Sequence, residues 1–364
     1  MVEYAKYELK NVCSRLSSGK SISSKMISEE GRYPVYGGNG LRGYTDHSNF
    51  SGDCAIIGRQ GAFCGNVRYF SGEAYMTEHA VVVCANNLNN THYLAYLLST
   101  MNLGRLSGQS AQPGLSVKTL GIQEIMLPSI EYQNKGVALL SSLDEKIAVN
   151  NNINDNLQQQ AQAIYEEMFI NNPDVSMTSG TLSDIATVTM GQSPKGSSYN
   201  EQAIGEVFYQ GRAEFGFRFP SRRLYTTEPK RIAEPGDILL SVRAPVGDLN
   251  VAYERCCIGR GLGAIHSKYG HSSFILYTMF SLKPQLDVFN GEGTVFGSIN
   301  RDSLNAMPVE IPSPDRIEQF EAFARPMDDL VRSNYEEICR LEALRDSLLP
   351  KLMSGEIDVS GIQL

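Results

Sequence analysis

Two long stretches of sequence decide the fold, and each has the pattern of a single helix. Residues 315–353 are DRIEQFEAFARPMDDLVRSNYEEICRLEALRDSLLPKLM, and residues 132–169 are YQNKGVALLSSLDEKIAVNNNINDNLQQQAQAIYEEMF. Apolar residues recur in both at alternating spacings of three and four, which is typical of the seam of a coiled coil. At 1.5 Å per residue, each helix is expected to be roughly 57 Å long.

The two seams correspond residue by residue after a shift of 184 positions. The positions expected to hold the helices together are Leu143, Ile147, Asn150, Leu157 and Ile164 in the first helix and Met327, Val331, Asn334, Leu341 and Leu348 in the second. Asn150 and Asn334 are matching polar positions, and a polar seam residue can fix register and partner choice at some cost in stability. The matching seams predict an antiparallel pair within one chain, with a globular domain at each end.

The repeat extends beyond the helices, so the chain is a tandem duplication. The same shift places Arg59 on Arg243 and Tyr69 on Tyr253. Each half begins with sequence rich in Gly, Tyr and Ser and with short β-type runs such as CAIIG, HAVVVC and DILLSV. Such runs favour a compact, irregular α+β domain. The predicted divisions are two globular domains and two helical regions, in the order 1–127, 128–176, 177–311 and 312–364.

The formal net charge of −8 is concentrated on the predicted helices. Residues 133–168 hold five acidic and two basic side chains, and residues 315–346 hold nine acidic and five basic ones. The globular halves are therefore nearly neutral, with local basic clusters, so the overall acidity does not exclude a nucleic-acid partner. The seven cysteines form no CxxC pair, and no apolar run approaches the roughly 20 residues of a membrane span. We expect a cytoplasmic chain with no membrane partner, disulfide framework or metal site.

Two glycine-rich stretches resemble nucleotide-binding loops but fail in context. Residues 38–43, GNGLRG, have the G-x-G-x-x-G spacing, yet no apolar strand precedes them and no helical pattern follows. In residues 191–197, GQSPKGS, the lysine precedes the second glycine instead of following it, which removes the phosphate-binding geometry. No motif of an adenine methyltransferase, a nuclease or a serine hydrolase is recognisable. We expect no catalytic residue, bound cofactor or metal in this chain.

Polar side chains on glycine-rich loops occur in both halves and are candidates for contact with DNA. Arg and Lys can bond guanine edges, Asn and Gln can bond adenine edges, and small loop residues allow close approach to phosphates. The candidates are Lys20, Asn39, Arg42, Tyr44, Arg59, Gln60, Arg68 and Gln112 in the first half and Lys195, Gln210, Arg212, Arg218, Arg222, Arg223, Arg243 and Arg260 in the second. Because Arg59 and Arg243 share repeat positions, we expect a common scaffold or phosphate role for them. The regions around Asn39 and Arg218 differ between the halves and are better candidates for base recognition.

Over essentially its whole length, the chain resembles the specificity subunits of type I restriction–modification systems. The resemblance is carried in the helical regions by LEALRDSLLPKLMSGEIDVS, by IPSPDRIEQFEAF and by its counterpart in the first half, LPSIEYQNKGVALLSSLDEKI. In the globular domains it is carried by GDILLSVRAPVG, GDCAIIGRQGAFCG and GQSPKGSSY. In that family two target-recognition domains each recognise half of a split double-stranded DNA site. The helical regions dock two methyltransferase subunits, and restriction–translocase subunits join them for cleavage. S-adenosylmethionine, ATP and Mg bind to those partners, so the resemblance implies a non-catalytic subunit without a cofactor of its own.

Two other hypotheses stay open at this point. The first is an interaction scaffold, in which a coiled coil bears two β-rich domains that bind protein or carbohydrate. The second is a hydrolase or transferase whose site has no recognisable motif. DNA binding that weakens steeply with salt would favour the specificity subunit over the scaffold.

Overall fold

The computed structural model describes residues 3–107, 114–173, 176–291, 297–359 and 361. The chain divides into two compact units, which are Met1–Val149 with Glu337–Leu364 (unit 1) and Asn150–Glu336 (unit 2). The division falls inside the two long helices, α3 (Ile130–Glu166) and α8 (Pro314–Ser354), so each unit contains one globular part and about half of each helix. The predicted boundaries at residues 127, 176 and 311 follow the repeat instead, and they stay a prediction.

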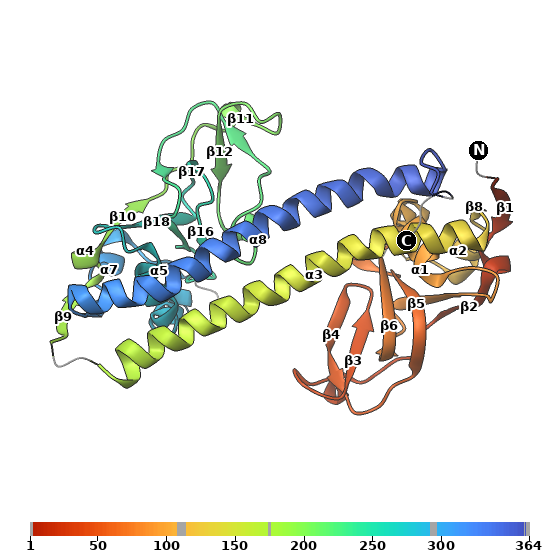
Figure 1. Cartoon of the computed structure of the whole chain (residues 1–364), viewed down its shortest axis with the longest axis horizontal. Helices are drawn as coiled ribbons and strands as arrows, with labels where there is room; N and C mark the ends of the chain where they lie inside the picture. Colours follow the sequence, from red (N-terminus) through yellow and green to blue (C-terminus); the bar gives the residue numbers. More distant parts are fainter. Residues whose placement is uncertain (1–2, 108–113, 174–175, 292–296, 360, 362–364) are drawn as a thin grey trace. The chain divides into compact units, whose positions relative to one another are not determined.

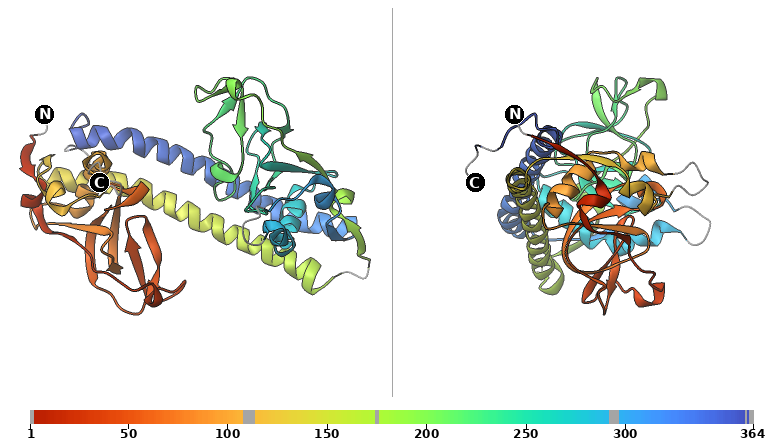
Figure 2. Two further views of the ribbon diagram at one scale, coloured as in Figure 1. Left: turned by 180° about the vertical axis from the view of Figure 1, so that it is seen from behind. Right: turned by 90° about the vertical axis from the view of Figure 1, so that its right-hand side faces the viewer.

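Within each unit the two long helices lie side by side and run antiparallel (Figure 1, Figure 2). In unit 1 Asp144 of α3 accepts a hydrogen bond from Arg345 of α8, and in unit 2 Asn154 of α3 accepts one from Asn334 of α8. The residue numbers of the partners on α8 decrease as those on α3 increase, as in an antiparallel pair. The first helix continues into a π-helical turn at Glu167–Asn171. Among the described residues, no helix is both long enough and apolar enough to cross a bilayer.

The face on which the two helices pack contains the ten predicted seam residues, all of which are buried or half-buried. The buried members are Ile147, Asn150, Val331 and Asn334. Asn334 donates from Nδ2 to Oδ1 of Asn154 at 2.8 Å. A polar contact therefore lies inside the seam of unit 2, where it favours one register of the helices.

Unit 1 is built on a six-stranded sheet with strand order β2-β7-β5-β6-β3-β4, accompanied by a two-stranded sheet of β1 and β8. Helix α1 packs on β5 and β6. Its buried residues Tyr93 and Leu94 share a core with Leu352 of α8 and with Val359 beyond that helix. The elements are β1 Ala5–Glu8, β2 Cys13–Ser18, β3 Tyr33–Gly37, β4 Gly40–Thr45, β5 Phe50–Gly58, β6 Val67–Met76, β7 Ala80–Ala85, α1 Thr91–Ser99, α2 Val117–Gly121 and β8 Glu124–Leu127.

Unit 2 holds a four-stranded sheet, β10-β18-β15-β16, a five-stranded sheet, β11-β13-β12-β17-β14, and the pair β9 and β19. Rings of Tyr165 on α3, Phe169 in the π-helical turn after it, Phe274 on α5 and Phe320 on α8 pack against one another, so the long helices are part of the core of this unit. The elements are β9 Thr178–Thr181, α4 Leu182–Ile185, β10 Ala186–Met190, β11 Tyr199–Asn200, β12 Glu206–Tyr209, β13 Tyr225–Thr226, β14 Ile232–Ala233, β15 Ile238–Ser241, β16 Leu249–Val251, β17 Cys256–Ile258, β18 Leu262–Ser267, α5 Ser272–Ser281, α6 Lys283–Asp287, α7 Arg301–Asn305 and β19 Pro308–Ile311.

The duplication predicted from the sequence recurs in the order of these elements. The shift of 184 residues relates β8 to β19, α2 to α7 and the first residue of α3 to that of α8. Each half is therefore an α+β domain followed by a long helix, as predicted.

Between the paired strands β5 and β7 and their counterparts β15 and β18, however, the shift is one or two residues smaller. Gly58 pairs with Ala80 in the first half, and Ser241 pairs with Leu262 in the second. The residue after β5, Arg59, thus corresponds to Val242, and the next residue, Gln60, corresponds to Arg243. The isolated bridges agree, because Gln60 pairs with Gly114 and Arg243 with Ser298, which are 184 residues apart. The predicted equivalence of Arg59 and Arg243 is wrong, because a constant shift ignores small length differences between the halves.

Candidate nucleic-acid interface

In the first half, three backbone segments meet where β5 ends and β7 begins. The loop after β2 is attached there, because the N–H of Lys20 donates to the carbonyl of Met76 at 3.0 Å. A Cβ atom on Gly19 would lie 2.1 Å from the carbonyl oxygen of Met76, so only glycine allows this close approach. The N–H of Arg59 donates to the carbonyl of His79 at 3.0 Å. These contacts gather one Gly/Ser loop and two strand ends at a single edge.

The second half builds the same edge with the same contacts. The N–H of Gln192 donates to the carbonyl of Ile258 at 3.0 Å, and the N–H of Val242 donates to that of Gly261 at 3.0 Å. A Cβ atom on Gly191 would lie 2.1 Å from the carbonyl oxygen of Gly259. We call this place in each half the loop edge, and it comprises residues 18–21, 59–60 and 76–79 in the first half and 191–195, 242–243 and 258–262 in the second.

The turn between β3 and β4 packs onto the loop edge of the first half. A Cβ atom on Gly38 would lie 3.0 Å from the carbonyl oxygen of His79, and one on Gly40 would lie 3.0 Å from the guanidinium of Arg68. Gly40 has a φ of 96°, which strongly favours glycine. Arg42 follows on β4. The glycines of residues 38–43 therefore allow a tight turn to lie against arginine side chains, and this packing accounts for their spacing.

Basic side chains of the first half are not matched by acidic ones at this edge. Lys20, Arg42, Arg59 and Arg68 form no ion pair with any carboxylate in the part of the chain that the structure describes. Arg59 is half-buried, and its guanidinium donates to the hydroxyl of Ser18 at 3.4 Å. The other predicted residues are placed as follows: Asn39 exposed in the β3–β4 turn, Tyr44 half-buried on β4, Gln60 exposed with its Oε1 3.0 Å from Nδ1 of His79, and Gln112 outside the described residues.

In the second half, the predicted residues divide into paired and unpaired ones. The paired arginines are Arg212 with Asp248, Arg218 with Asp328, Arg222 with Glu254 and Arg223 with Glu214. Lys195, Arg243 and Arg260 are exposed and form no ion pair with a described carboxylate. Gln210 is exposed and donates from Nε2 to the hydroxyl of Ser193 at 3.0 Å, on the loop that bears Lys195. These three unpaired cations lie on the loop edge of the second half, as Lys20 and Arg59 lie on that of the first.

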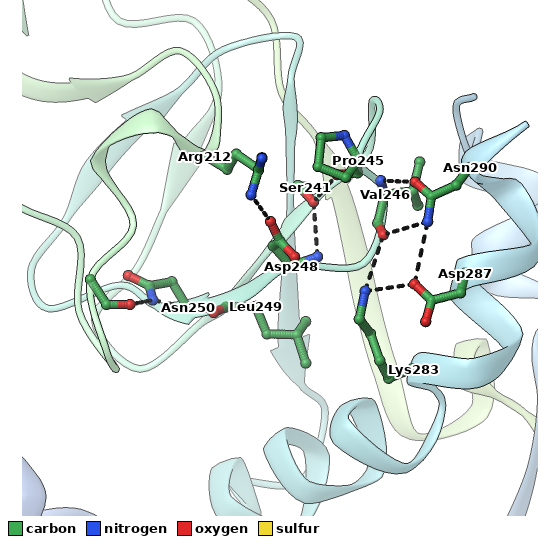
Figure 3. A network of polar contacts seen from close by, with 11 residues as sticks. Arg212, Ser241, Pro245, Val246, Asp248, Leu249, Asn250, Lys283, Asp287 and Asn290 are labelled. Carbon is green, nitrogen blue, oxygen red and sulfur yellow. Dashed lines mark hydrogen bonds and ion pairs between the residues drawn. The ribbon is translucent and has the colours of Figure 1, made fainter. Parts of the chain in front are cut away.

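A hydrogen-bond network fixes the loop on which Arg243 stands (Figure 3). The hydroxyl of Ser241 accepts from the N–H of Asp248 at 2.9 Å and donates to the carbonyl of Pro245 at 2.8 Å. Arg212 pairs with the Asp248 carboxylate. Arg212 therefore helps to hold this loop in shape, while Arg243 stays exposed at its start.

Comparisons with known proteins agree with this geometry. A family model described as the type I restriction modification DNA specificity domain matches residues 1–159. The putative type I restriction enzyme MjaX specificity subunit of Methanocaldococcus jannaschii is 29% identical over 322 residues, which cover 81% of this chain and 76% of that protein. The type I restriction enzyme EcoprrI specificity subunit of Escherichia coli is 41% identical over 134 residues, 36% of this chain and 33% of that one.

Over most of its length the chain is similar to type I specificity subunits, and residues 1–159 match the model of their DNA specificity domain. A type I specificity subunit recognises DNA and is not itself catalytic. The crystal structure of the S subunit of a type I restriction–modification system from M. genitalium matches this chain with a TM-score of 0.65 at 16% identity, covering 96% of each. That likeness confirms the predicted fold class, an α+β chain with two globular domains and two long helices.

One predicted DNA contact is wrong. Arg218 is only 4% exposed. Its guanidinium donates to Asp328 at 2.6 Å and to Gln158 at 3.0 Å, so these donors are not available to a phosphate or a base. The stretch around it is rich in arginine, and nothing in the sequence shows which of these side chains turns inward.

The structure also places two unpredicted residues at the loop edges, His79 in the first half and Ser193 in the second. Each bonds a predicted glutamine; Ser193 lies in the recognised loop GQSPKGS, whereas His79 belongs to no motif that could have identified it. Across the described residues, no group of three His, Cys, Asp or Glu side chains is placed to hold a metal ion.

Proposed function

We propose that this specificity subunit recognises a bipartite double-stranded DNA target, with one globular domain for each half of the site. The observation that supports this most strongly is the loop edge, which recurs in both halves and bears cations without acidic partners. Exposed Lys and Arg side chains on backbone that is held in place suit contact with phosphates and base edges. A scaffold for neutral ligands would have no need to leave cations unpaired at the same edge twice.

Within this proposal, the two loop edges divide their roles between phosphates and bases. Lys20 and Lys195 stand on Gly/Ser loops, where small residues allow approach to the sugar–phosphate backbone. Gln60 and Arg243 occupy corresponding positions and differ in chemistry. A glutamine suits the N6/N7 edge of adenine, and an arginine suits the O6/N7 edge of guanine. The pair is therefore a source of different base preferences in the two half-sites.

The long helices are proposed to dock two methyltransferase subunits, which restriction–translocase subunits join for cleavage. Apolar side chains that are exposed on the otherwise charged helices support this role, because such side chains are typical of protein interfaces. They include Val149 and Ile153 on α3 and Phe323, Leu330 and Leu344 on α8. S-adenosylmethionine, ATP and Mg would bind to those cytoplasmic partners. The 37 residues of α3 give a length of about 55 Å, enough to separate half-sites by one to two turns of DNA at about 34 Å each.

Co-expression with the methyltransferase subunit, followed by sequencing of methylated adenines, tests this function. The expected result is a motif split into two specified halves by a spacer of fixed length and free sequence. Formation of the complex without a split motif would contradict the proposal and favour the scaffold. The affinity of the complex for DNA should also fall steeply with salt, because phosphate contacts release counterions.

A further inference from the structure

Two aspartates at the same repeat position join the globular domains to the long helices. Asp144 of α3 and Asp328 of α8 are 184 residues apart, the shift that relates the starts of these helices. Asp144 accepts a hydrogen bond from the hydroxyl of Tyr96 on α1 at 2.5 Å, and Asp328 accepts one from Tyr277 on α5 at 3.1 Å. Both tyrosines stand six residues after the N-cap of their helix. We call each aspartate, with its tyrosine and arginine, an aspartate anchor.

In unit 1 the arginine of the anchor comes from the other long helix. Arg345 of α8 donates from Nη1 to Asp144 at 2.9 Å. On the side of the globular domain, the ring of Tyr96 stacks on His92 with 4.6 Å between centroids, and His92 stacks on Tyr69 of β6 with 3.7 Å. A continuous series of contacts therefore leads from a strand of the sheet through α1 to both long helices.

In unit 2 the arginine comes from the globular domain itself. Arg218 donates to Asp328 of α8 at 2.6 Å and to Gln158 of α3 at 3.0 Å. Its carbonyl accepts the N–H of Val251 at the end of β16 at 2.8 Å. This one residue thus connects a strand of the domain to both long helices, and Tyr277 of α5 completes the group.

Each anchor adds polar contacts at the margin of the apolar core through which its domain already contacts the helices, since Tyr277 belongs to that core in unit 2 and Tyr96 packs against it in unit 1. A buried ion pair often stabilises a protein no more than well-packed apolar side chains would, because taking two charges out of water is costly. It does, however, accept few alternative geometries, since each charge must keep its partner. A second, geometrically strict attachment restricts how far a domain can turn on its helices.

We propose that Asp144 and Asp328 are positioning residues that fix the angle of each recognition domain on the helix pair, and that they thereby restrict the spacer between the two half-sites to one length. This inference rests on the proposed function, because it needs a bipartite target. The anchors touch no base in this account. They determine where the loop edges meet the DNA.

The test uses the full chain co-expressed with the methyltransferase subunit and a target library in which the spacer is varied one base pair at a time. The double variant Arg218→Gln/Asp328→Asn removes both charges of one anchor and leaves polar side chains of similar size. Asp144→Asn perturbs the other anchor, and Tyr277→Phe removes only one hydroxyl. We expect the preference for the wild-type spacer over its neighbours to fall about tenfold in the double variant, which corresponds to about 1.4 kcal/mol of discrimination. The specified bases of both half-sites should stay unchanged.

Asp329→Asn is the matched control, because Asp329 is adjacent on α8, exposed, and without a hydrogen bond or ion pair to any residue in the described ranges. It should keep the wild-type spacer preference. A merely structural role for the anchors would lower methylation equally at all spacers.

The inference is overturned if the folded double variant keeps the single wild-type spacer. If that variant does not fold, Asp144→Asn and Tyr277→Phe decide in its place, and an unchanged spacer in both overturns it. If wild-type protein methylates no split motif, the proposed function itself has failed. That result is distinct from a split motif with an unaltered spacer, which refutes only the anchors.

Discussion

The two aspartate anchors should contribute very differently to stability, although they occupy the same repeat position. Arg218 is 4% exposed, so Asp328→Ala leaves a buried guanidinium without its carboxylate. Such a loss costs about 3–5 kcal/mol. The side chains of Arg345 and Asp144 are 28% and 35% exposed, so water can replace the carboxylate in Asp144→Ala. Loss of a partly exposed ion pair and one tyrosine hydrogen bond costs about 1–2 kcal/mol.

Urea unfolding followed by circular dichroism measures both losses as changes in the free energy of unfolding. The double variant Arg218→Ala/Asp328→Ala should recover part of the loss, with a coupling of about 1–3 kcal/mol between the two positions. The exposed neighbour Asp329→Ala should change stability by no more than about 0.5 kcal/mol. Equal losses for Asp144→Ala and Asp328→Ala, or additive effects of Arg218→Ala and Asp328→Ala, would refute the reasoning from burial.

Three further predictions concern pH, salt and the glycine turn. Burial raises the pKa of Glu321 above its usual 4.5, so the stabilisation by its protonated carboxyl is full below that value and is lost as pH rises through the higher folded-state pKa. Urea unfolding measured across this pH range should show the loss in the wild-type protein and not in Glu321→Gln. A variant with the wild-type pH profile would contradict this. Lys195→Ala should reduce the slope of log affinity against log salt by about 1, because this cation is assigned to a phosphate. DNA titration of the methyltransferase complex measures the slope, and an unaltered slope would exclude that contact. Gly40→Ala should lower the free energy of unfolding by about 1–3 kcal/mol. Gly40 has a φ of 96°, and the new Cβ would lie 3.0 Å from the guanidinium of Arg68. A variant as stable as the wild-type protein would contradict the requirement for glycine at this turn.

The long elements were predictable because their signal repeats many times. Each helix shows the apolar spacing of a seam over its whole length, and the same seam occurs twice at a constant shift. The sheets have short strands and loops of unequal length, so a constant shift misplaces residues there by one or more positions. Gln60 and Arg243 therefore correspond only once the strand pairing is known.

The candidate site was predictable in composition but not in arrangement. Lys20 and Lys195 were recognisable because their Gly/Ser loops recur, and both stand at a loop edge. Which arginines are unpaired depends on contacts between distant segments, such as Arg218 with Asp328. Asp144 and Asp328 match in the sequence, but acidic residues are frequent on both helices and no local pattern distinguishes the two that bond a tyrosine.

The most direct test of the central claim, that each globular domain recognises its own half of a split DNA target, is an exchange of residues 1–127 for the corresponding domain of another specificity subunit. The methylated motif of the complex is then determined by sequencing. The account predicts that one half of the motif changes to that of the donor protein, while the other half keeps its bases. A motif that changes in both halves, or in neither, would contradict the account.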